Sequence, residues 1–236
     1  EELSSPNVAE VSVTGQYLTN SNPLYRQYTG MTHEGLNGSI DLNVVQRSEN
    51  GQWIRLEGRD LGLRTQEFKA GIEQQGDWAI GVGYNQIPHF GPYQVTTSVT
   101  VVGTNTLNLP ASLAFGEQTL KTERTATSLT AQKFISDNLV VNVGFKSEEK
   151  KGARLMGANG NANGYVGMLF TPEPIDANHK QIEASLDYYT KTFQITAGYY
   201  GSFFKNNVGN ALTVNYGTTG MVNAIGAAST QMSPMS

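Results

Sequence analysis

The residues of this sequence that could do chemistry are charged side chains placed at alternate positions of several segments. Arg55, Glu57 and Arg59, for example, are separated by Leu56 and Gly58. Successive side chains of a β-strand point to opposite faces, so this spacing gathers the charges on one face. A charged face needs water or a polar partner. The candidate site residues chosen in this way are Arg55, Glu57, Arg59, Glu67, Lys69, Glu73, Lys146, Glu148, Glu183 and Asp187.

Metal and thiol chemistry are disfavoured. The three histidines, His33, His89 and His179, lie far apart in segments that we expect to be loops, where histidines are usually solvated. The sequence has no cysteine, which removes disulfides, thiolate metal sites, catalytic thiols and covalent attachment of c-type haem. We therefore expect this chain to bind no metal and no cofactor of its own.

Other catalytic and nucleic-acid signatures are missing from the sequence. The Gly/Asn-rich run 157–164 lacks the Lys-Ser/Thr of a phosphate loop and reads as a flexible external loop. No Gly-x-Ser-x-Gly elbow occurs. The net charge of -4, without a basic stripe, argues against a nucleic-acid partner. We expect a protein that is not an enzyme.

The elements that must position the charged residues are β-strands. Hydrophobic residues make up 38% of the chain, and they alternate with polar ones and form no run long enough for a transmembrane helix. Asn50-Gly51 is a strong hairpin signal between two such segments. The alternation predicts strands over about 8–19, 36–46, 52–60, 64–74, 78–86, 119–134, 139–148, 181–190 and 193–204.

The predicted connections alternate in length. Those after the second, fourth, sixth and eighth strands are short, whereas those after the first, fifth, seventh and ninth are long; the third is an exception. The longest, near 87–118 and 149–178, contain several prolines and are expected to be external loops. Outer-membrane barrels have short periplasmic turns and long outer loops. The sequence therefore predicts an all-β, antiparallel, up-and-down transmembrane β-barrel.

The two faces of the predicted strands agree with this fold. A barrel in lipid turns its apolar face outward and lines its lumen with the polar face, because a Lys or Arg at the lipid midplane costs roughly 2 to 4 kcal/mol. Aromatic residues near strand ends resemble the girdles of such barrels, although they could also be the core of a soluble β-protein. These aromatic residues are Trp53, Trp78, Tyr84, Phe145, Phe193 and Tyr199.

We expect residues 1–236 to form one domain, because no linker-like composition divides the chain. Nine strands do not close a bacterial up-and-down barrel, in which strand numbers are even. Either a tenth strand lies near 211–216, or the chain is an incomplete portion of a larger porin-like barrel. The start at Glu1, without Met or a signal peptide, fits a processed exported protein or a trimmed one.

Several short stretches resemble the MtrB/PioB family of decahaem-associated outer-membrane proteins. They occur between 53 and 204 in the order expected for that family, and the resemblance covers the N-terminal portion of its longer members. Some members carry an N-terminal Cys-x-x-Cys that is absent here. The matching stretches are WIRLEGRDLGL at 53–63, GYNQIPH at 83–89, LKTER at 120–124, PEPID at 172–176 and GYYGSFF at 198–204.

The resemblance implies a porin-like sheath in the bacterial outer membrane that holds a periplasmic multihaem c-type cytochrome in its lumen. Electrons would cross the membrane through the haems of that partner, and an extracellular multihaem cytochrome is a further implied partner. The charged residues above would then face the lumen and contact the cytochrome. A general diffusion porin and a soluble β-rich binding module are the alternatives.

Overall fold

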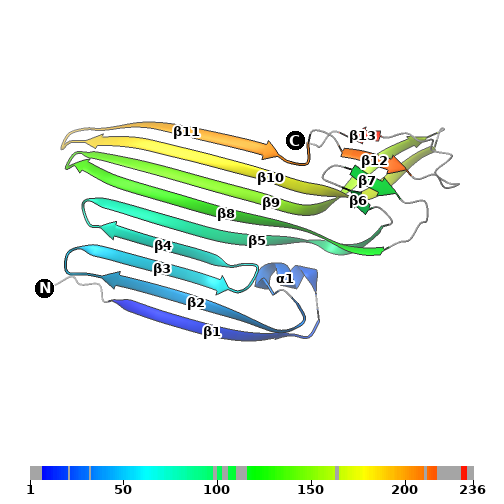
Figure 1. The fold of residues 1–236 in the computed structure, drawn as a ribbon, viewed down its shortest axis with the longest axis horizontal. Coiled ribbons are helices and arrows are strands. Elements are labelled where there is room, and N and C mark those ends of the chain that lie inside the picture. The colour runs from blue at the N-terminus through cyan, green and yellow to red at the C-terminus, as the bar shows by residue number, and fades with distance from the viewer. Residues whose placement is uncertain are drawn as a thin grey trace. The chain divides into compact units, whose positions relative to one another are not determined.

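The structure, a computed structural model, describes residues 7–20, 22–31, 33–97, 100–102, 106–109, 116–162, 165–209, 212–216 and 230–232. Most of these residues are in β-strands (Figure 1). In chain order the elements are β1 (Val8–Leu18), α1 (Pro23–Thr29), β2 (Gly35–Arg47), β3 (Gln52–Leu61), β4 (Glu67–Gln74), β5 (Trp78–Thr97), β6 (Thr100–Val102), β7 (Thr106–Leu109), β8 (Gly116–Ser136), β9 (Leu139–Ala162), β10 (Tyr165–Tyr189), β11 (Gln194–Asn206), β12 (Leu212–Tyr216) and β13 (Thr230–Met232).

Nine strands form one sheet in the order β1-β2-β3-β4-β5-β8-β9-β10-β11. Sheet neighbours are also chain neighbours except at the step from β5 to β8, and the pairings from β1 to β5 are antiparallel. The expectation of an all-β, antiparallel, up-and-down arrangement is confirmed. Within the described residues, β1 and β11 are the two outer strands.

Tight turns set the register of the hairpins. Between β2 and β3, the side chain of Asn50 accepts a hydrogen bond from the backbone N–H of Gln52 at 3.2 Å, and Gly51 adopts φ +80°. Between β4 and β5, Gly76 adopts φ +75° and the N–H of Asp77 donates to the carbonyl of Gln74 at 3.0 Å. Glycine adopts positive φ without a steric penalty, so these two turns form as the sequence predicts.

The connection from β1 to β2 contains the helix α1, which the strand pattern did not predict. The side chain of Asn22 accepts hydrogen bonds from the N–H groups of Leu24 and Tyr25, at 2.9 and 3.3 Å. Pro23 begins the helix, and Gly30 ends it in the left-handed conformation. These are ordinary start and stop signals of a helix. No helix in the described ranges is long and apolar enough to cross a membrane.

The connection from β3 to β4 is short because Asp60 folds the chain back locally. Asp60 has φ +51°, and its N–H donates to the carboxylate of Asp41 at 2.7 Å. Thr65 Oγ1 donates to the carboxylate of Asp60 at 3.1 Å. Strand β4 consequently begins at Glu67, three residues after the start that the alternation predicts.

The chain packs as two compact units, each assembled from separate segments. One comprises Glu1–Pro88, Arg124–Glu149 and His179–Phe204; the other comprises His89–Glu123, Lys150–Asn178 and Lys205–Ser236. The second unit contains a four-stranded sheet in the order β13-β12-β7-β6, in which β12 pairs parallel to β7. The units are not successive in sequence, and the expectation of one domain over 1–236 stays a prediction.

The expectation of loops near 87–118 and 149–178 is wrong for the parts of these ranges that the structure describes, which are in strands; positions 98–99, 103–105, 110–115 and 163–164 lie outside the described residues. Strand β5 continues to Thr97, and β8 begins at Gly116. Strand β9 continues to Ala162, and β10 begins at Tyr165. Prolines and glycines favour loops, yet a strand tolerates them where its hydrogen-bond ladder is interrupted or where it lies at an edge. The expected strand near 211–216 exists as β12, but it belongs to the four-stranded sheet.

The register separates the side chains of the nine-stranded sheet into two faces. Val13 pairs with Ile40, Val44 with Leu56, and Ile72 with Ile80, and these pairs lie on one face, which we call the apolar face. The alternate positions form the polar face. Large side chains of the apolar face project outward: Val13 is 75% exposed and Tyr199 62%. Such a continuous exposed apolar surface is unusual for a soluble monomer and typical of contact with lipid.

Candidate functional site

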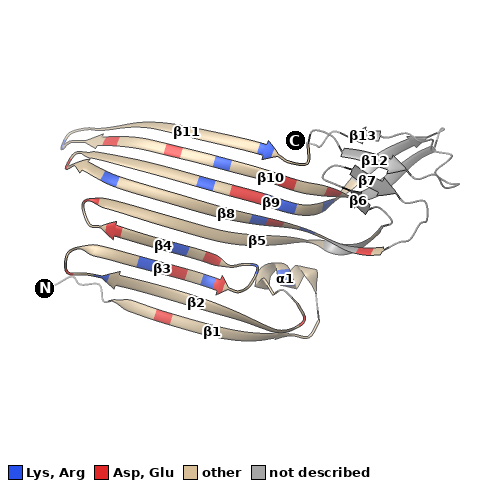
Figure 2. Cartoon of the chain, viewed as in Figure 1, with Lys and Arg blue, Asp and Glu red and all other residues tan. Residues whose placement is uncertain are grey.

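Charged residues occur along β3, β4, β9 and β10 (Figure 2). The ten singled out in the sequence belong to these strands, and all lie on the polar face. In β3 and β4 the register itself shows this: Glu57 pairs with Lys69, and Arg59 pairs with Glu67. All ten belong to the first compact unit. The sheet thus places residues from Arg55 to Asp187, which are far apart in the sequence, on one face.

Charges of opposite sign are paired on this face. Arg55 reaches Glu73 with both terminal nitrogens, at 3.4 and 3.5 Å, and Lys69 lies 2.6 Å from Glu67. The side chains of Arg55 and Lys69 are 48% and 60% exposed, so water screens both pairs. Exposed pairs contribute at most about 1 kcal/mol each. Their main effect is to keep the face hydrated and nearly neutral.

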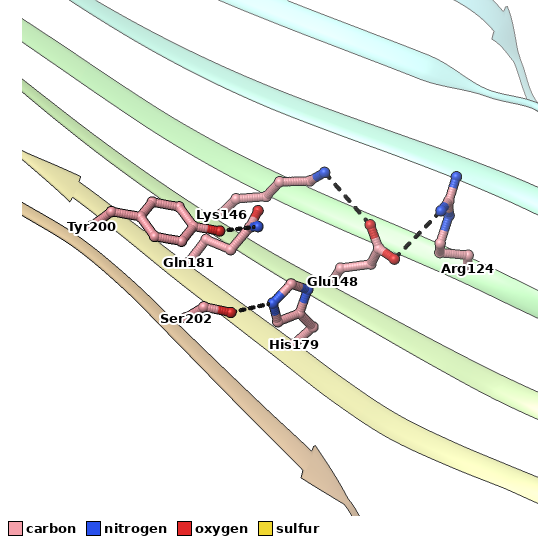
Figure 3. Close-up of polar contacts among 7 residues, drawn as sticks. All are labelled: Arg124, Lys146, Glu148, His179, Gln181, Tyr200 and Ser202. Atoms are coloured by element: carbon pink, nitrogen blue, oxygen red, sulfur yellow. Dashed lines mark hydrogen bonds and ion pairs between the residues drawn. The ribbon is translucent and has the colours of Figure 1, made fainter. Parts of the chain in front are cut away.

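A second cluster of charges lies on β8 and β9. The carboxylate of Glu148 is 3.5 Å from both Arg124 and Lys146, which come from neighbouring strands of the sheet (Figure 3). Lys146 and Glu148 were predicted site residues, whereas Arg124 was missed. Arg124 is flanked by the polar residues Glu123 and Thr125. Apolar and polar residues therefore do not alternate clearly at this point of β8, and the sequence does not show which face Arg124 occupies.

The polar face of β9, β10 and β11 carries a hydrogen-bonded network. The amide of Asn142 donates to Asp187 at 2.7 Å and to Ser185 at 3.2 Å, and Thr196 donates to Asp187 at 2.6 Å. Further along, Gln181 donates to the hydroxyl of Tyr200 at 2.8 Å (Figure 3). These neutral and charged groups satisfy one another across strands and leave the surface wettable.

The histidines do not form a metal site in the part of the chain that the structure describes, where no suitable group of three His, Cys, Asp or Glu occurs. His179 Nε2 lies 2.8 Å from the hydroxyl of Ser202 on the polar face. The expectation that all three lie in loops is wrong for two of them, because His89 is in β5 and His179 in β10.

Trp53 lies on the polar face, which corrects its assignment to a lipid-facing girdle. Its ring is contacted by the guanidinium groups of Arg47 and Arg55, each 4.9 Å from the ring centroid. Such cation–π contacts hold the ring against the sheet. The indole Nε1 is buried and has no hydrogen-bond partner among the described residues. Trp78 and Tyr84, by contrast, pair with Gln74 and Phe68 on the apolar face, so their role in a girdle stays a prediction.

A groove of about 720 Å³ lies on the polar face. Trp53, Arg55 and Glu73 line it at β3 and β4, and Glu183 and Tyr200 line it at β10 and β11. Between them the lining includes glycines of four strands. We call this the glycine groove, and the glycines are Gly71, Gly81, Gly144 and Gly198.

For two of these glycines, the described residues give no steric or conformational reason for glycine. A Cβ at Gly71 would lie 3.7 Å from the nearest atom, the carbonyl oxygen of Ile80, and one at Gly144 would lie 3.7 Å from Cβ of Glu183. These are ordinary contacts, and neither residue has positive φ. Glycine in a strand costs roughly 0.5 to 1 kcal/mol relative to alanine. Sequence alternation alone did not reveal this groove, because it arises from side-by-side positions on separate strands.

Comparison with known proteins gives two findings. The family model for outer membrane beta-barrel porins of the MtrB/PioB type matches residues 17–236. A curated relative, the outer membrane protein MtrB of Shewanella baltica (strain OS185), is 28% identical over 186 residues, which cover 72% of this chain and 26% of the relative. The chain therefore spans about a quarter of the length of the curated relative that it matches.

Proposed function

Because the chain belongs to the MtrB/PioB family of outer-membrane β-barrel porins, we propose that it forms part of a wide barrel wall that encloses a periplasmic multihaem c-type cytochrome. The protein is located in the outer membrane. The observation that supports the proposal most is the two-faced sheet: an exposed apolar face opposite a face of paired charges. One face can meet lipid while the other meets a hydrated protein surface.

The apolar stripes occupy only one end of the longest strands. A barrel strand crosses the hydrocarbon layer with about 9 to 11 residues. Strand β9 has 24 residues, but the apolar positions of its lipid-side face run from Leu139 to Phe145 and are followed by Ser147 and Glu149. In β10, which has 25 residues, they run from Tyr188 back to Ile182 and are followed by Lys180. We infer that the remainder of each strand lies outside the hydrocarbon layer.

The polar face suits a cytochrome in the lumen. A multihaem cytochrome has a polar surface and cannot lie directly in lipid, because unsatisfied polar groups there cost several kcal/mol each. Half-exposed pairs such as Arg55–Glu73 can exchange partners with charges of either sign on that surface. The haem would belong to the partner, and an extracellular multihaem cytochrome would accept or supply electrons at the outer side.

The proposed role assigns no catalytic step to this chain. The charges of the polar face would position and solvate the partner, and electron transfer would run between its haems. A general diffusion porin is the second candidate, since paired, hydrated charges also suit a water-filled channel. The two candidates differ in whether a haem protein stays in the barrel.

The test is purification of the full-length protein in detergent from cells that express it with its native cytochromes. The visible spectrum of the purified fraction gives the haem content, and an SDS gel of unheated samples reports the folded barrel. A c-type spectrum in a fixed ratio to the barrel supports the proposal. A folded, colourless barrel that conducts small solutes in planar bilayers would support the diffusion porin instead.

A further inference from the structure

We propose that the glycine groove is the place where the enclosed cytochrome approaches the barrel wall most closely, with a short protruding segment of its polypeptide seated in the groove. This inference rests on the proposed function and specifies the part of the wall that would make the contact. Three features of the groove support it: its open backbone, the chemistry of its walls and the buried indole nitrogen at one end.

The missing side chains of the glycines leave the backbone of the groove open to a partner. At Gly71 and Gly144 the wall would accept a Cβ without a clash, so the described residues give no steric reason for the missing side chains. A glycine of this kind within a strand marks a position where another backbone or a ligand approaches closely. Elsewhere on the polar face long side chains such as Lys69 and Lys146, which are 60% and 48% exposed, keep a partner at a distance.

The walls select a polypeptide segment as the occupant. Arg55 and Glu73 at one side, and Glu183 at the other, offer both donors and acceptors. The two carboxylates outnumber the one guanidinium group, so a purely anionic ligand would be repelled. A polypeptide presents N–H donors, carbonyl acceptors and side chains of either sign, so it complements both walls. The groove, about 720 Å³, has room for a few residues and not for a haem domain.

Trp53 gives an additional reason. Its Nε1 is shielded from water and lacks an acceptor among the described residues, although indole N–H groups usually find a partner when buried. Trp53 also lines the groove. Movement of the half-exposed Arg55 side chain, which lies over the ring, would let a carbonyl or carboxylate oxygen of the seated segment reach Nε1 and supply the missing acceptor.

The experiment fills the groove in the full-length barrel expressed with its cytochrome. Gly71 and Gly144 are each replaced by Ala and by Leu, since the wall has space for the first atoms of either side chain. Ser12→Leu is the matched control, because Ser12 pairs with Asp41 on the polar face and is exposed outside the groove. Haem per folded barrel is measured after washes of increasing stringency, with unheated SDS gels as the check of folding.

We expect Gly71→Leu and Gly144→Leu to lower cytochrome retention at least about tenfold, because overpacking a filled contact costs on the order of a tenfold change in affinity or more. The alanine variants should fall between these and the wild type, and Ser12→Leu should equal the wild type. Full retention in both folded leucine variants would overturn the inference and leave the proposed function standing. A wild-type barrel without any haem would overturn both. If a leucine variant does not fold, the corresponding alanine variant decides: retention at the wild-type level overturns the inference.

Discussion

Trp53 and Trp78 lie on opposite faces of one sheet, beside two neighbouring turns that are joined by a hydrogen bond from the N–H of Gln75 to the carbonyl of Gly51 at 3.0 Å. Trp53 pairs with Glu73, and Trp78 pairs with Gln74, the next residue of the same strand. Trp53 is held by two arginines among the charged residues, while Trp78 shares its face with Ile80 and Val82. The pair marks the polar and lipid-side surfaces of the wall at nearly the same depth.

Their fluorescence should separate the two surfaces. In vesicles of brominated lipid, the full-length protein should lose the emission contributed by Trp78 and keep that of Trp53, because bromine quenches only at short range. The contribution of each is obtained by difference, from Trp78→Phe and Trp53→Phe variants. Stronger lipid quenching of Trp53 than of Trp78 would reverse the assignment of the faces.

A positive charge should be tolerated on one face of β2 and not on the other. Val44 is on the apolar face and pairs with Ala9 and Leu56, whereas its neighbour Asn43 is on the polar face and is exposed. Val44→Arg should lower the free energy of unfolding from a bilayer by roughly 2 to 4 kcal/mol if it lies near the midplane. Asn43→Arg, at almost the same depth, is the matched control and should change it by less than about 0.5 kcal/mol.

Denaturant unfolding of both variants in lipid vesicles measures the difference. Equal destabilisation by the two substitutions would mean that the faces do not differ in environment. A larger effect for Asn43→Arg would place the polar face in lipid and contradict the orientation proposed for the sheet.

Two ion pairs of different burial should contribute differently to stability. The side chain of Glu173 is only 10% exposed and binds Arg154 at 2.5 and 3.3 Å, while Glu67, bound to Lys69, is 32% exposed. Glu173→Gln should cost about 1 to 2 kcal/mol, a value reduced because half of Arg154 is in solvent. Glu67→Gln should cost between 0 and about 1 kcal/mol.

Amide exchange around each pair, compared between the wild type and the two variants, reports these local costs. Raising the salt concentration should weaken the effect of Glu67→Gln more than that of Glu173→Gln, because exposed charges are screened. A Glu67→Gln variant that loses more protection than Glu173→Gln would contradict the burial argument.

Period-two alternation was sufficient to predict most of the strands. It did not predict features that depend on other signals or on the pairing of several strands. It predicted β2, β3 and the two faces of the sheet. Trp53 and Arg55 are two positions apart on β3 and therefore share the polar face, so the alternation itself argues against placing Trp53 in a lipid-facing girdle. The helix α1 was missed although Asn22, Pro23 and Gly30 are its start and stop signals. The continuation of β9 and β10 through polar residues was not predictable from alternation, because partner strands and not apolar side chains stabilise it.

The sequence predicted the charged residues of the candidate site but not the contacts between its strands. The ten charged residues fall on one face because parity is a local property of each strand. Arg124 joined Glu148 only through the pairing of β8 with β9. The glycine groove depends on which glycines lie side by side, as Gly71 and Gly81 do across β4 and β5. That register is set by turns and cannot be read from one strand.

The most direct test of the central claim, that the polar face meets an enclosed cytochrome, is site-specific photocrosslinking in native membranes. A benzoylphenylalanine replaces Lys69 on the polar face or, as the control, Ile80 on the apolar face of the full-length protein. We predict that the Lys69 position gives a crosslinked band that stains for haem and that the Ile80 position gives none. A haem-staining product from Ile80 alone, or none from Lys69 in a barrel that retains its cytochrome, would contradict the account.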